Sequence, residues 1–302
     1  MSFGEAPVHL PVMEREVVRI LSSDEVEVFL DATVGAGGHA RALLESAGPR
    51  ARLVGLDRDP DLLATARERL AGFGDRVRLA HRSFAEIEDV LEELGEPAIC
   101  GALFDLGANS HHFDRPERGF SFLTPGPLDM RFDTTGGETA EDLVNGRSEE
   151  ELAQLIHDLG DERRARRIAR AIVSERPFRD TVRLAEVVRA ATGGGGRTHP
   201  ATRTFQALRI AVNRELDHVE RGIPAAVRRL REGGRLVVIS FHSGEDRLVK
   251  RLLKEEQRAG RVHPLTRKPL LPTADEIRRN PRARSARIRA VQIGNALNGD
   301  GA

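Results

Sequence analysis

The stretch GALFDLGANSHHFD is the part of this chain in which the residue types most clearly suggest chemistry. An apolar run ends in Asp105, and Asn109, Ser110, His111 and His112 follow shortly after it. A metal site fits poorly, because two adjacent histidines point in different directions from an extended backbone and no further ligand follows at the usual spacing. A serine nucleophile also fits poorly, since the strained glycine elbow is absent. We therefore interpret the stretch as the rim of a ligand pocket that holds no metal.

A glycine-rich segment, LDATVGAGGHA, suggests a second part of the same pocket. The spacing of Gly35, Gly37 and Ala40 formally fits the dinucleotide fingerprint G-x-G-x-x-G/A, which predicts an NAD site. Asp31 precedes this loop and argues against NAD, because a carboxylate repels a diphosphate and attracts an ammonium group. S-adenosylmethionine carries such an ammonium group at its methionine end. The sequence therefore favours S-adenosylmethionine over NAD as the ligand.

Two further predicted strand ends carry residues that suit S-adenosylmethionine. Asp57 ends the apolar segment ARLVGLD and can accept hydrogen bonds from both ribose hydroxyls, although an NAD site would use it equally well. Phe84 follows another apolar segment and can flank the adenine, and a core position explains it equally well. Parallel sheets bind ligands at the carboxyl ends of their strands, so we expect Asp57, Phe84 and Asp105 at one edge.

Strand and helix patterns alternate over the first 107 residues, which predicts a parallel sheet wrapped by helices. The predicted strands span 26–31, 51–57, 77–84 and 98–107, and the predicted helices span 37–48, 59–74 and 86–95. A long loop and a mostly helical region follow, with one long helix predicted over 202–223, before a strand pattern resumes at 233–246. The predicted fold class is α/β, a doubly wound sheet with an inserted helical domain. Residues 1–112 and 213–302 form the sheet domain, and residues 113–212 form the insertion.

The composition is that of a globular protein, with 39% hydrophobic and 31% charged residues. No apolar run approaches the ~20 residues that a membrane helix needs, and the first residues lack the pattern of a signal peptide. With Cys100 as the single cysteine, no disulfide framework or cysteine metal cluster is expected. We expect a cytoplasmic protein that does not associate with membranes.

The formal net charge of zero conceals a basic segment. From Arg247 to Arg289, 14 Arg and Lys residues stand against 4 Asp and Glu residues, a surplus of +10. Such a segment is either a solvated helical face or a surface that binds phosphates of a nucleic acid. Arg203 and Arg209 allow the same two interpretations. Trp and Tyr are absent, so Phe241 or a histidine would have to stack on a base.

Several long motifs together identify a family: DATVGAGGH, LDRDP, ERGFSF, GPLDMRFD, HPATRTFQALRIAVN, VISFHSGEDRLVKR and PLTRKP. On these motifs the chain resembles, over nearly its whole length, the bacterial methyltransferases that modify N4 of a cytosine in small-subunit (16S) ribosomal RNA. The resemblance implies a Rossmann-like class I methyltransferase sheet with an inserted domain, S-adenosyl-L-methionine as cofactor, and a cytidine near the decoding centre as target. The implied partner is small-subunit ribosomal RNA or an assembling small subunit, and a homodimer stays open.

The resemblance also implies which residues contact the cofactor. These are Gly37, Gly38, His39, Asp57, Phe84 and Asp105. A further contact is implied at His112, which stands where the family has a glutamine. An imidazole can also donate a hydrogen bond, so the contact can be kept.

Methylation of a cytosine amino group sets a requirement for the catalytic residues. The nitrogen lone pair is delocalised into the ring, so the enzyme must align the nitrogen with the methyl group and accept the amino hydrogens. Asp105 and Asn109 are the candidates for this role. His242, in SFHSGED after another predicted strand, could hold RNA or orient the base, or it could cap a helix. An NAD-dependent dehydrogenase and a non-catalytic RNA-binding factor remain as alternatives.

Overall fold

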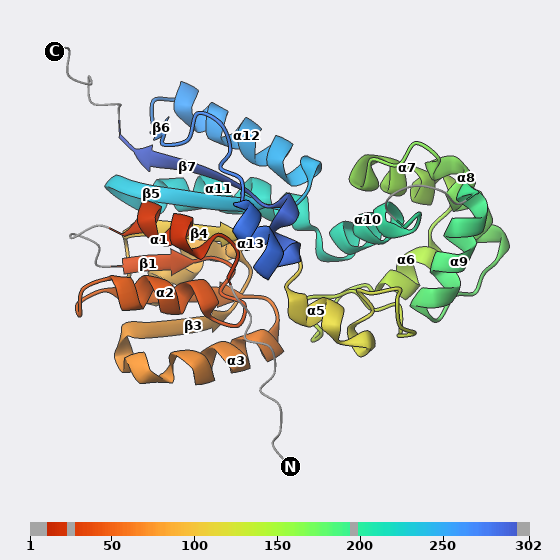
Figure 1. The fold of residues 1–302 in the computed structure, drawn as a ribbon, viewed down its shortest axis with the longest axis horizontal. Coiled ribbons are helices and arrows are strands. Elements are labelled where there is room, and N and C mark those ends of the chain that lie inside the picture. The colour runs from red at the N-terminus through yellow and green to blue at the C-terminus, as the bar shows by residue number, and fades with distance from the viewer. Residues whose placement is uncertain (1–10, 23–27, 194–198, 295–302) are drawn as a thin grey trace. The chain divides into compact units, whose positions relative to one another are not determined.

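The structure is a computed structural model that describes residues 11–22, 28–193 and 199–294, and the chain divides into two compact units (Figure 1). Unit 1 comprises the chain up to Gly107 and from Leu216 onward, and unit 2 comprises Ala108–Glu215. The sequence prediction places these boundaries at 112/113 and 212/213. Residues 26–27 of the first predicted strand lie outside the described residues.

Unit 1 contains a seven-stranded sheet in the order β3-β2-β1-β4-β5-β7-β6. The strands are β1 (Val28–Asp31), β2 (Arg52–Asp57), β3 (Val77–His81), β4 (Ile99–Asp105), β5 (Leu230–Ser240), β6 (Val262–Pro264) and β7 (Arg287–Ile293). Strands β1 to β5 pair in parallel, and β7 pairs antiparallel with β5 and β6. Strands β2 and β3 lie on one side of β1, and β4 and β5 lie on its other side, so the order of the strands reverses between β1 and β4. Ligands bind beyond the carboxyl ends of strands at such a switch point. The predicted α/β, doubly wound fold class is confirmed.

Helices cover both faces of the sheet. Helices α1 (Glu14–Leu21), α2 (Gly38–Ser46) and α3 (Pro60–Leu70) contribute to one core, and α4 (Ile87–Glu93), α11 (Glu215–Arg229) and α12 (Ser243–Arg258) contribute to the other. The side chains of β1 alternate between these cores, with Val28 and Leu30 in one and Phe29 in the other. Because both faces are covered, the inner strands read as continuous apolar runs in the sequence.

Short elements complete unit 1. They are the 3-10 helices η1 (Ala71–Arg76), η2 (Phe84–Glu86) and η4 (Pro281–Ser285), and helix α13 (Ala274–Arg279). Among the described residues of both units, no helix is long and apolar enough to cross a membrane.

Unit 2 is helical and has a core of its own. Its elements are α5 (Ser110–Asp114), η3 (Pro116–Arg118), α6 (Ala140–Gly146), α7 (Glu149–Gly160), α8 (Ala165–Ser174), α9 (Thr181–Thr192) and α10 (Thr202–Asn213). Helix α7 begins at a capping box, in which the Glu151 amide donates to Ser148 Oγ at 3.2 Å and the Ser148 amide donates to the Glu151 carboxylate at 2.8 Å. Leu152 and Ile156 of this helix are fully buried, as their helical spacing predicts.

The prediction of one long helix over 202–223 is wrong, because the chain breaks into α10 and α11 at Arg214. Arg214 has a left-handed backbone with a φ of 48°. The preceding Asn213 is buried, and its side chain bonds to distant backbone: Nδ2 donates to the Met130 carbonyl and Oδ1 accepts from the Phe132 amide, both at 2.7 Å. These tertiary bonds explain a break that helical periodicity does not reveal.

Candidate active site

Three aspartates end three adjacent strands of the sheet. Asp31 is the last residue of β1, Asp57 of β2 and Asp105 of β4, and β1 lies between the other two strands. Because the three strands run in parallel, their carboxyl ends meet at the same edge. The structure thus brings together the three aspartates that the sequence singles out.

Asp31 is buried and Asp57 is half-buried, and both carboxylates are held by backbone amides. Asp31 Oδ1 accepts from the Thr33 amide at 3.2 Å, and burial, followed by the charge of Asp57, raises the pKa of Asp31 to about 7. Asp57 Oδ2 accepts from the Gly35 amide at 2.7 Å, and Oδ1 accepts from the Asp59 amide at 2.9 Å. Burial raises the pKa of Asp57 to about 6, although the amide donors partly oppose it. A bound cation would favour the ionised form of both groups.

Asp105 is fixed through its backbone, and part of its carboxyl group lacks a partner. Its amide donates to Thr33 Oγ1 at 2.7 Å, which ties β4 to the loop after β1. Within the described part of the chain, the buried Oδ1 has no hydrogen-bond partner, and Oδ2 lies 3.7 Å from His39 Nδ1. Burial, and then the charges of Asp31 and Glu245, raise the pKa of Asp105 well above its ordinary value. A ligand that donates to Oδ1 would remove the cost of this unpaired acceptor.

His39 presents a hydrogen-bond acceptor to Asp105. Its Nε2 lies 2.9 Å from the Val12 carbonyl, which can only accept, so Nε2 carries the proton and Nδ1 has the free lone pair. Burial lowers the pKa of His39 to about 4, so the ring is neutral at pH 7. Asp31, Asp105 and His39 therefore offer acceptors without a compensating positive charge of their own. Such a set fits a cationic ligand with N–H donors.

The glycine loop brings bare backbone to the same edge. Gly37 has a φ of 81°, which residues with a side chain rarely adopt, and it precedes the first turn of α2. A Cβ atom on Gly38 would lie 2.7 Å from Pro11 Cγ, so a side chain there would clash. Because Gly37 has no side chain to cap the helix, the first amides of α2 are available to an anionic group such as a carboxylate.

Phe84 lies just beyond β3 in a half-buried position. Its ring meets the ring of Phe104 edge-on at 5.4 Å and that of His218 at 6.1 Å. A Cβ atom on Gly222 would lie 2.7 Å from Phe84 Cδ2, so α11 approaches the ring closely. Ser83 Oγ lies 2.9 Å from Nδ1 of His218 on the same helix. These contacts fix the ring and leave part of it exposed, which is compatible with an adenine wall.

His242 follows β5 and caps helix α12. Its Nδ1 accepts from the Glu245 amide at 3.3 Å, and its Nε2 lies 3.0 Å from Glu245 Oε1. The buried Glu245 carboxylate in turn accepts from the amides of Phe241 at 2.7 Å and His242 at 3.2 Å. This is a capping box with histidine in the cap position. The capping interpretation of His242 is therefore supported, and its role toward a substrate stays a prediction.

Asn109 and His112 lie in unit 2, where they order the start of α5. Asn109 Oδ1 accepts from the His111 amide at 3.1 Å, and His112 Nδ1 accepts from the Asn109 amide at 2.9 Å. The buried His112 ring lies 4.8 Å from the Phe120 ring and 4.9 Å from the Phe132 ring, measured between centroids. The roles of Asn109 in catalysis and of His112 in cofactor binding stay predictions.

The two arginines that precede the unit boundary have ordinary partners. Arg209 forms a bidentate ion pair with Glu215 at 2.8 and 3.0 Å, and both side chains are mostly buried. Arg203 donates to the Asp161 carbonyl at 2.8 Å and is about half exposed, at 55%. These contacts favour the structural interpretation for Arg209 over phosphate binding.

Three residues near the carboxyl ends of the strands are not predicted from the sequence: Thr33, His218 and Glu245. Thr33 and Glu245 lie inside the motifs DATVGAGGH and VISFHSGEDRLVKR, so the motifs themselves contain the signal. His218 approaches Ser83 from 135 residues away, and nothing in its helical surroundings distinguishes it from a surface residue.

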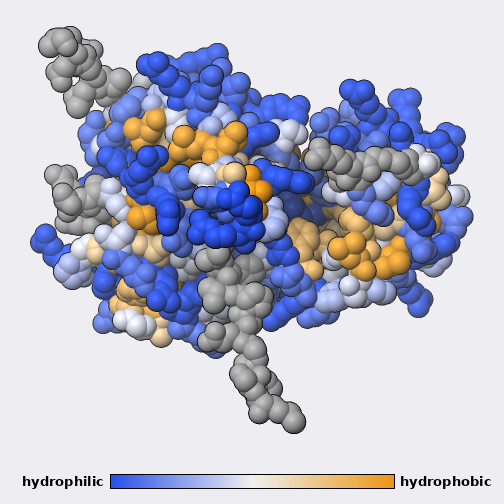
Figure 2. Space-filling view, in the orientation of Figure 1, coloured by the Kyte–Doolittle hydropathy of each residue, from blue (hydrophilic) through white to orange (hydrophobic). Residues whose placement is uncertain are grey.

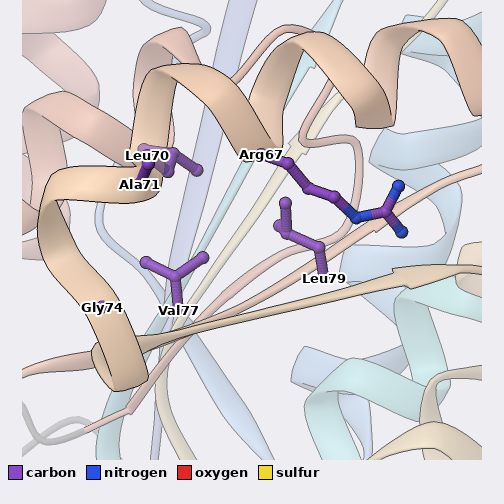
Figure 3. A pocket seen from close by; sticks show the side chains of 6 residues that line it. All are labelled: Arg67, Leu70, Ala71, Gly74, Val77 and Leu79. Atoms are coloured by element: carbon purple, nitrogen blue, oxygen red, sulfur yellow. The ribbon is translucent and has the colours of Figure 1, made fainter.

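A separate pocket is lined by residues of α3, η1 and β3 (Figure 3). Its lining consists of Arg67, Leu70, Ala71, Gly74, Val77 and Leu79. Val77 is the first residue of β3, so the pocket lies toward the amino end of that strand. The three aspartates lie at the carboxyl ends of their strands. It contains none of the candidate site residues and is not part of this site.

Comparison with known sequences decides the family. The profile of the MraW methylase family matches residues 6–294. The chain belongs to the MraW methylase family. A protein from Pelobacter propionicus named Ribosomal RNA small subunit methyltransferase H is 48% identical over 306 residues, which cover 94% of this chain and 98% of that protein. A protein of the same name from Sorangium cellulosum is 50% identical over 294 residues, which cover 95% of this chain and 92% of that protein.

The chain is therefore an S-adenosylmethionine-dependent methyltransferase, as the resemblance predicts, and the dehydrogenase alternative is excluded. The residues at the strand ends fit this cofactor. Asp31, Asp105 and His39 offer acceptors to its ammonium group, the carboxylates favour its positive charge, and the first amides of α2 can bind its carboxylate.

Proposed function

We propose that this enzyme transfers a methyl group from S-adenosylmethionine to the exocyclic N4 of a cytidine in small-subunit ribosomal RNA, near the decoding centre, in the bacterial cytoplasm. Relatives 48% and 50% identical to the chain bear the name Ribosomal RNA small subunit methyltransferase H, and they cover nearly all of it. The observation that carries the proposal is the Asp105 carboxyl group. It ends β4 beside two other aspartates, and its buried Oδ1 has no partner in the described part of the chain.

In this proposal, residues at different strand ends bind different parts of the cofactor. The Gly37 amide already donates to the Val34 carbonyl, so Gly37 brings bare backbone close to the cofactor while the Gly38 amide and the next amides of α2 bind the methionine carboxylate. Asp105 with His39 faces the cationic part. The carboxylate of Asp57 accepts hydrogen bonds from the ribose hydroxyls. Each of its oxygens has a second lone pair for this, because the Gly35 and Asp59 amides occupy only one lone pair each.

Roles toward the cofactor are also proposed for two aromatic side chains, one from each unit. Phe84 flanks the adenine, because its ring is fixed by Phe104 and α11 yet stays partly exposed. His112, from unit 2, provides the hydrogen bond that a glutamine provides in the family. Its Nδ1 accepts from the Asn109 amide at 2.9 Å, so the ring carries its proton on Nε2.

When bound, S-adenosylmethionine supplies a strongly electrophilic methyl group, so the chain's own task is to present the nucleophile. Asp105 and Asn109 accept the amino hydrogens of the cytosine and thereby turn the nitrogen lone pair toward the methyl group. A nearby cation keeps Asp105 ionised and therefore able to accept. The nitrogen becomes acidic as the new bond forms and can release its proton to water, so no general base is assigned. His242 is proposed to orient the base from the end of β5.

The experiment that tests this function is methyl transfer from labelled S-adenosylmethionine to small-subunit ribosomal RNA and to isolated small subunits, followed by nucleoside analysis. We expect the label in N4-methylcytidine, at a single position of one of these two substrates. Label in a different nucleoside would contradict the N4 assignment, and the absence of label from both substrates would contradict the RNA substrate. The substrate that accepts the label identifies the partner as free RNA or as an assembled particle.

A further inference from the structure

Helix α12 carries a row of basic side chains outside the proposed cofactor and catalytic residues. Arg247, Lys250, Lys254 and Arg258 recur at intervals of three, four and four residues, and all four are exposed. At 100° per residue these positions lie on one face of the helix. The opposite face is apolar and packs into the core through Leu248, Val249, Leu252 and Leu253. Figure 2 shows a hydrophilic surface where α12 lies in Figure 1.

The acidic residues near this row are engaged by other cations. Asp246 pairs with Arg289 at 2.8 Å, and Glu256 pairs with Arg261 at 2.5 Å. Arg251, on the same helix, pairs with Glu255 at 3.1 Å and with Glu220. In the part of the chain that the structure describes, the four basic side chains of the row have no ion-pair partner. Their charges are therefore not neutralised within the protein.

The row also has the geometry of a track. It begins one turn after His242, at the carboxyl edge of the sheet, and spans about 16 Å along the helix at about 1.5 Å per residue. Successive charges rise by about 4.5 to 6 Å, which is comparable to the separation of successive phosphates along an extended RNA strand. Flexible lysines and arginines on a helix can contact phosphates without reading sequence.

We propose that Arg247, Lys250, Lys254 and Arg258 form a phosphate track on which the RNA substrate lies as it enters the site. This inference rests on the proposed function and names the surface that holds its substrate. An RNA backbone is favoured over a protein partner because the row contains regularly spaced charges and no exposed apolar anchor. The track increases affinity for RNA and leaves cofactor binding and the chemical step unchanged.

A pair of matched double variants tests the track. Lys250→Gln with Lys254→Gln removes two charges four residues apart on α12. Arg15→Gln with Arg19→Gln removes two exposed charges at the same spacing on α1, which packs on the opposite face of the sheet. Each lost contact should lower the log–log salt slope of RNA binding by about 0.7, so the α12 variant should lose about 1.4. If the variant and the wild type bind RNA equally at 1 M salt, this slope change makes the Kd of the variant about 25-fold higher than that of the wild type at 0.1 M salt.

The measurements are the Kd for a small-subunit ribosomal RNA transcript at several salt concentrations, the Kd for S-adenosylmethionine, and KM and kcat for methyl transfer. We expect the α12 variant to lose RNA affinity and raise KM, with kcat and cofactor affinity unchanged, while the α1 variant behaves as wild type. Lys250→Arg with Lys254→Arg should restore binding. Equal RNA affinities for the α12 and α1 variants would overturn the track.

Two other outcomes are also decisive. If the α12 variant binds the free transcript normally but loses affinity for assembled small subunits, the surface contacts a ribosomal protein and the RNA track is wrong. If the wild-type protein methylates neither RNA nor subunits, the proposed function itself fails. The wild-type measurement therefore separates the failure of the function from the failure of the track.

Discussion

The affinity for S-adenosylmethionine should rise as the pH is raised from 6 to 8. In the free protein, burial raises the pKa of Asp31 to about 7 and that of Asp57 to about 6. Both carboxyls are therefore partly protonated near neutral pH. A cationic ligand binds the ionised form more tightly, so binding must release protons. The folded protein without ligand loses stability as the pH rises from about 4 to about 7, because over this range the raised carboxyl pKa values keep protons on the folded state that the unfolded state has lost. Cofactor binding should offset this loss.

The size of the effect follows from these values. A carboxyl group with a pKa of about 7 is about 90% protonated at pH 6 and about 10% protonated at pH 8, so Asp31 alone makes Kd about tenfold higher at pH 6. Asp57 adds about a factor of two, since it is half protonated at pH 6. Asp31 and Asp57 together change Kd about 20-fold, provided that both are ionised in the complex, and Asp105, whose pKa is also raised by burial, enlarges the change further.

Isothermal titration calorimetry at pH 6, 7 and 8, in buffers of different ionisation enthalpy, measures both Kd and the protons released. Asp31→Asn keeps the shape of the side chain but cannot titrate, so the change in its Kd over the same pH range should be about tenfold smaller than that of wild type. A wild-type Kd that does not vary with pH, or one that falls as the pH is lowered, would refute the reasoning. So would an Asp31→Asn variant that retains the full pH dependence.

Three further predictions concern single parts of the site. Asp57→Ala should weaken S-adenosylmethionine binding by one or two charge-assisted hydrogen bonds of roughly 1.5–3 kcal/mol each, and an unchanged calorimetric Kd would remove Asp57 from the site. His242→Asn should keep the stability to urea, because Asn also caps helices, and should raise KM for RNA. An unchanged KM would leave His242 with its capping role alone. Arg267→Ala with Lys268→Ala, both exposed, should lower the salt slope of RNA binding by about 1.4 and leave cofactor affinity unaltered. An unaltered slope would show that these two residues make no phosphate contact.

The sequence predicts the fold and the position of the three aspartates at the carboxyl ends of the strands, because both depend on local patterns. Buried parallel strands read as continuous apolar runs, and a polar residue at the end of such a run lies at the carboxyl edge. Asp31, Asp57 and Asp105 are therefore recognisable from the sequence alone. Gly37 is recognisable as well, because a backbone with positive φ before a helix selects glycine.

Other parts of the site depend on contacts between distant segments and could not be predicted. The 3.7 Å approach of His39 to Asp105 depends on how the loop after β1 packs beside β4. The neutral state of His39 depends on its bond to the Val12 carbonyl and on burial. The break at Arg214 follows from side-chain bonds of Asn213 that reach more than 80 residues back along the chain. Helical periodicity contains no signal for any of these contacts.

The most direct test of the central claim, that the Asp105 carboxyl group serves methyl transfer and not folding, is a comparison of Asp105→Ala with wild type. The measurement is single-turnover methyl transfer from labelled S-adenosylmethionine to small-subunit ribosomal RNA, with the Tm recorded in parallel. Because burial raises the pKa of Asp105 and its Oδ1 has no described partner, its removal should leave the Tm close to that of wild type. The variant should transfer no detectable methyl group. A variant that unfolds, or one that methylates at the wild-type rate, would contradict the account.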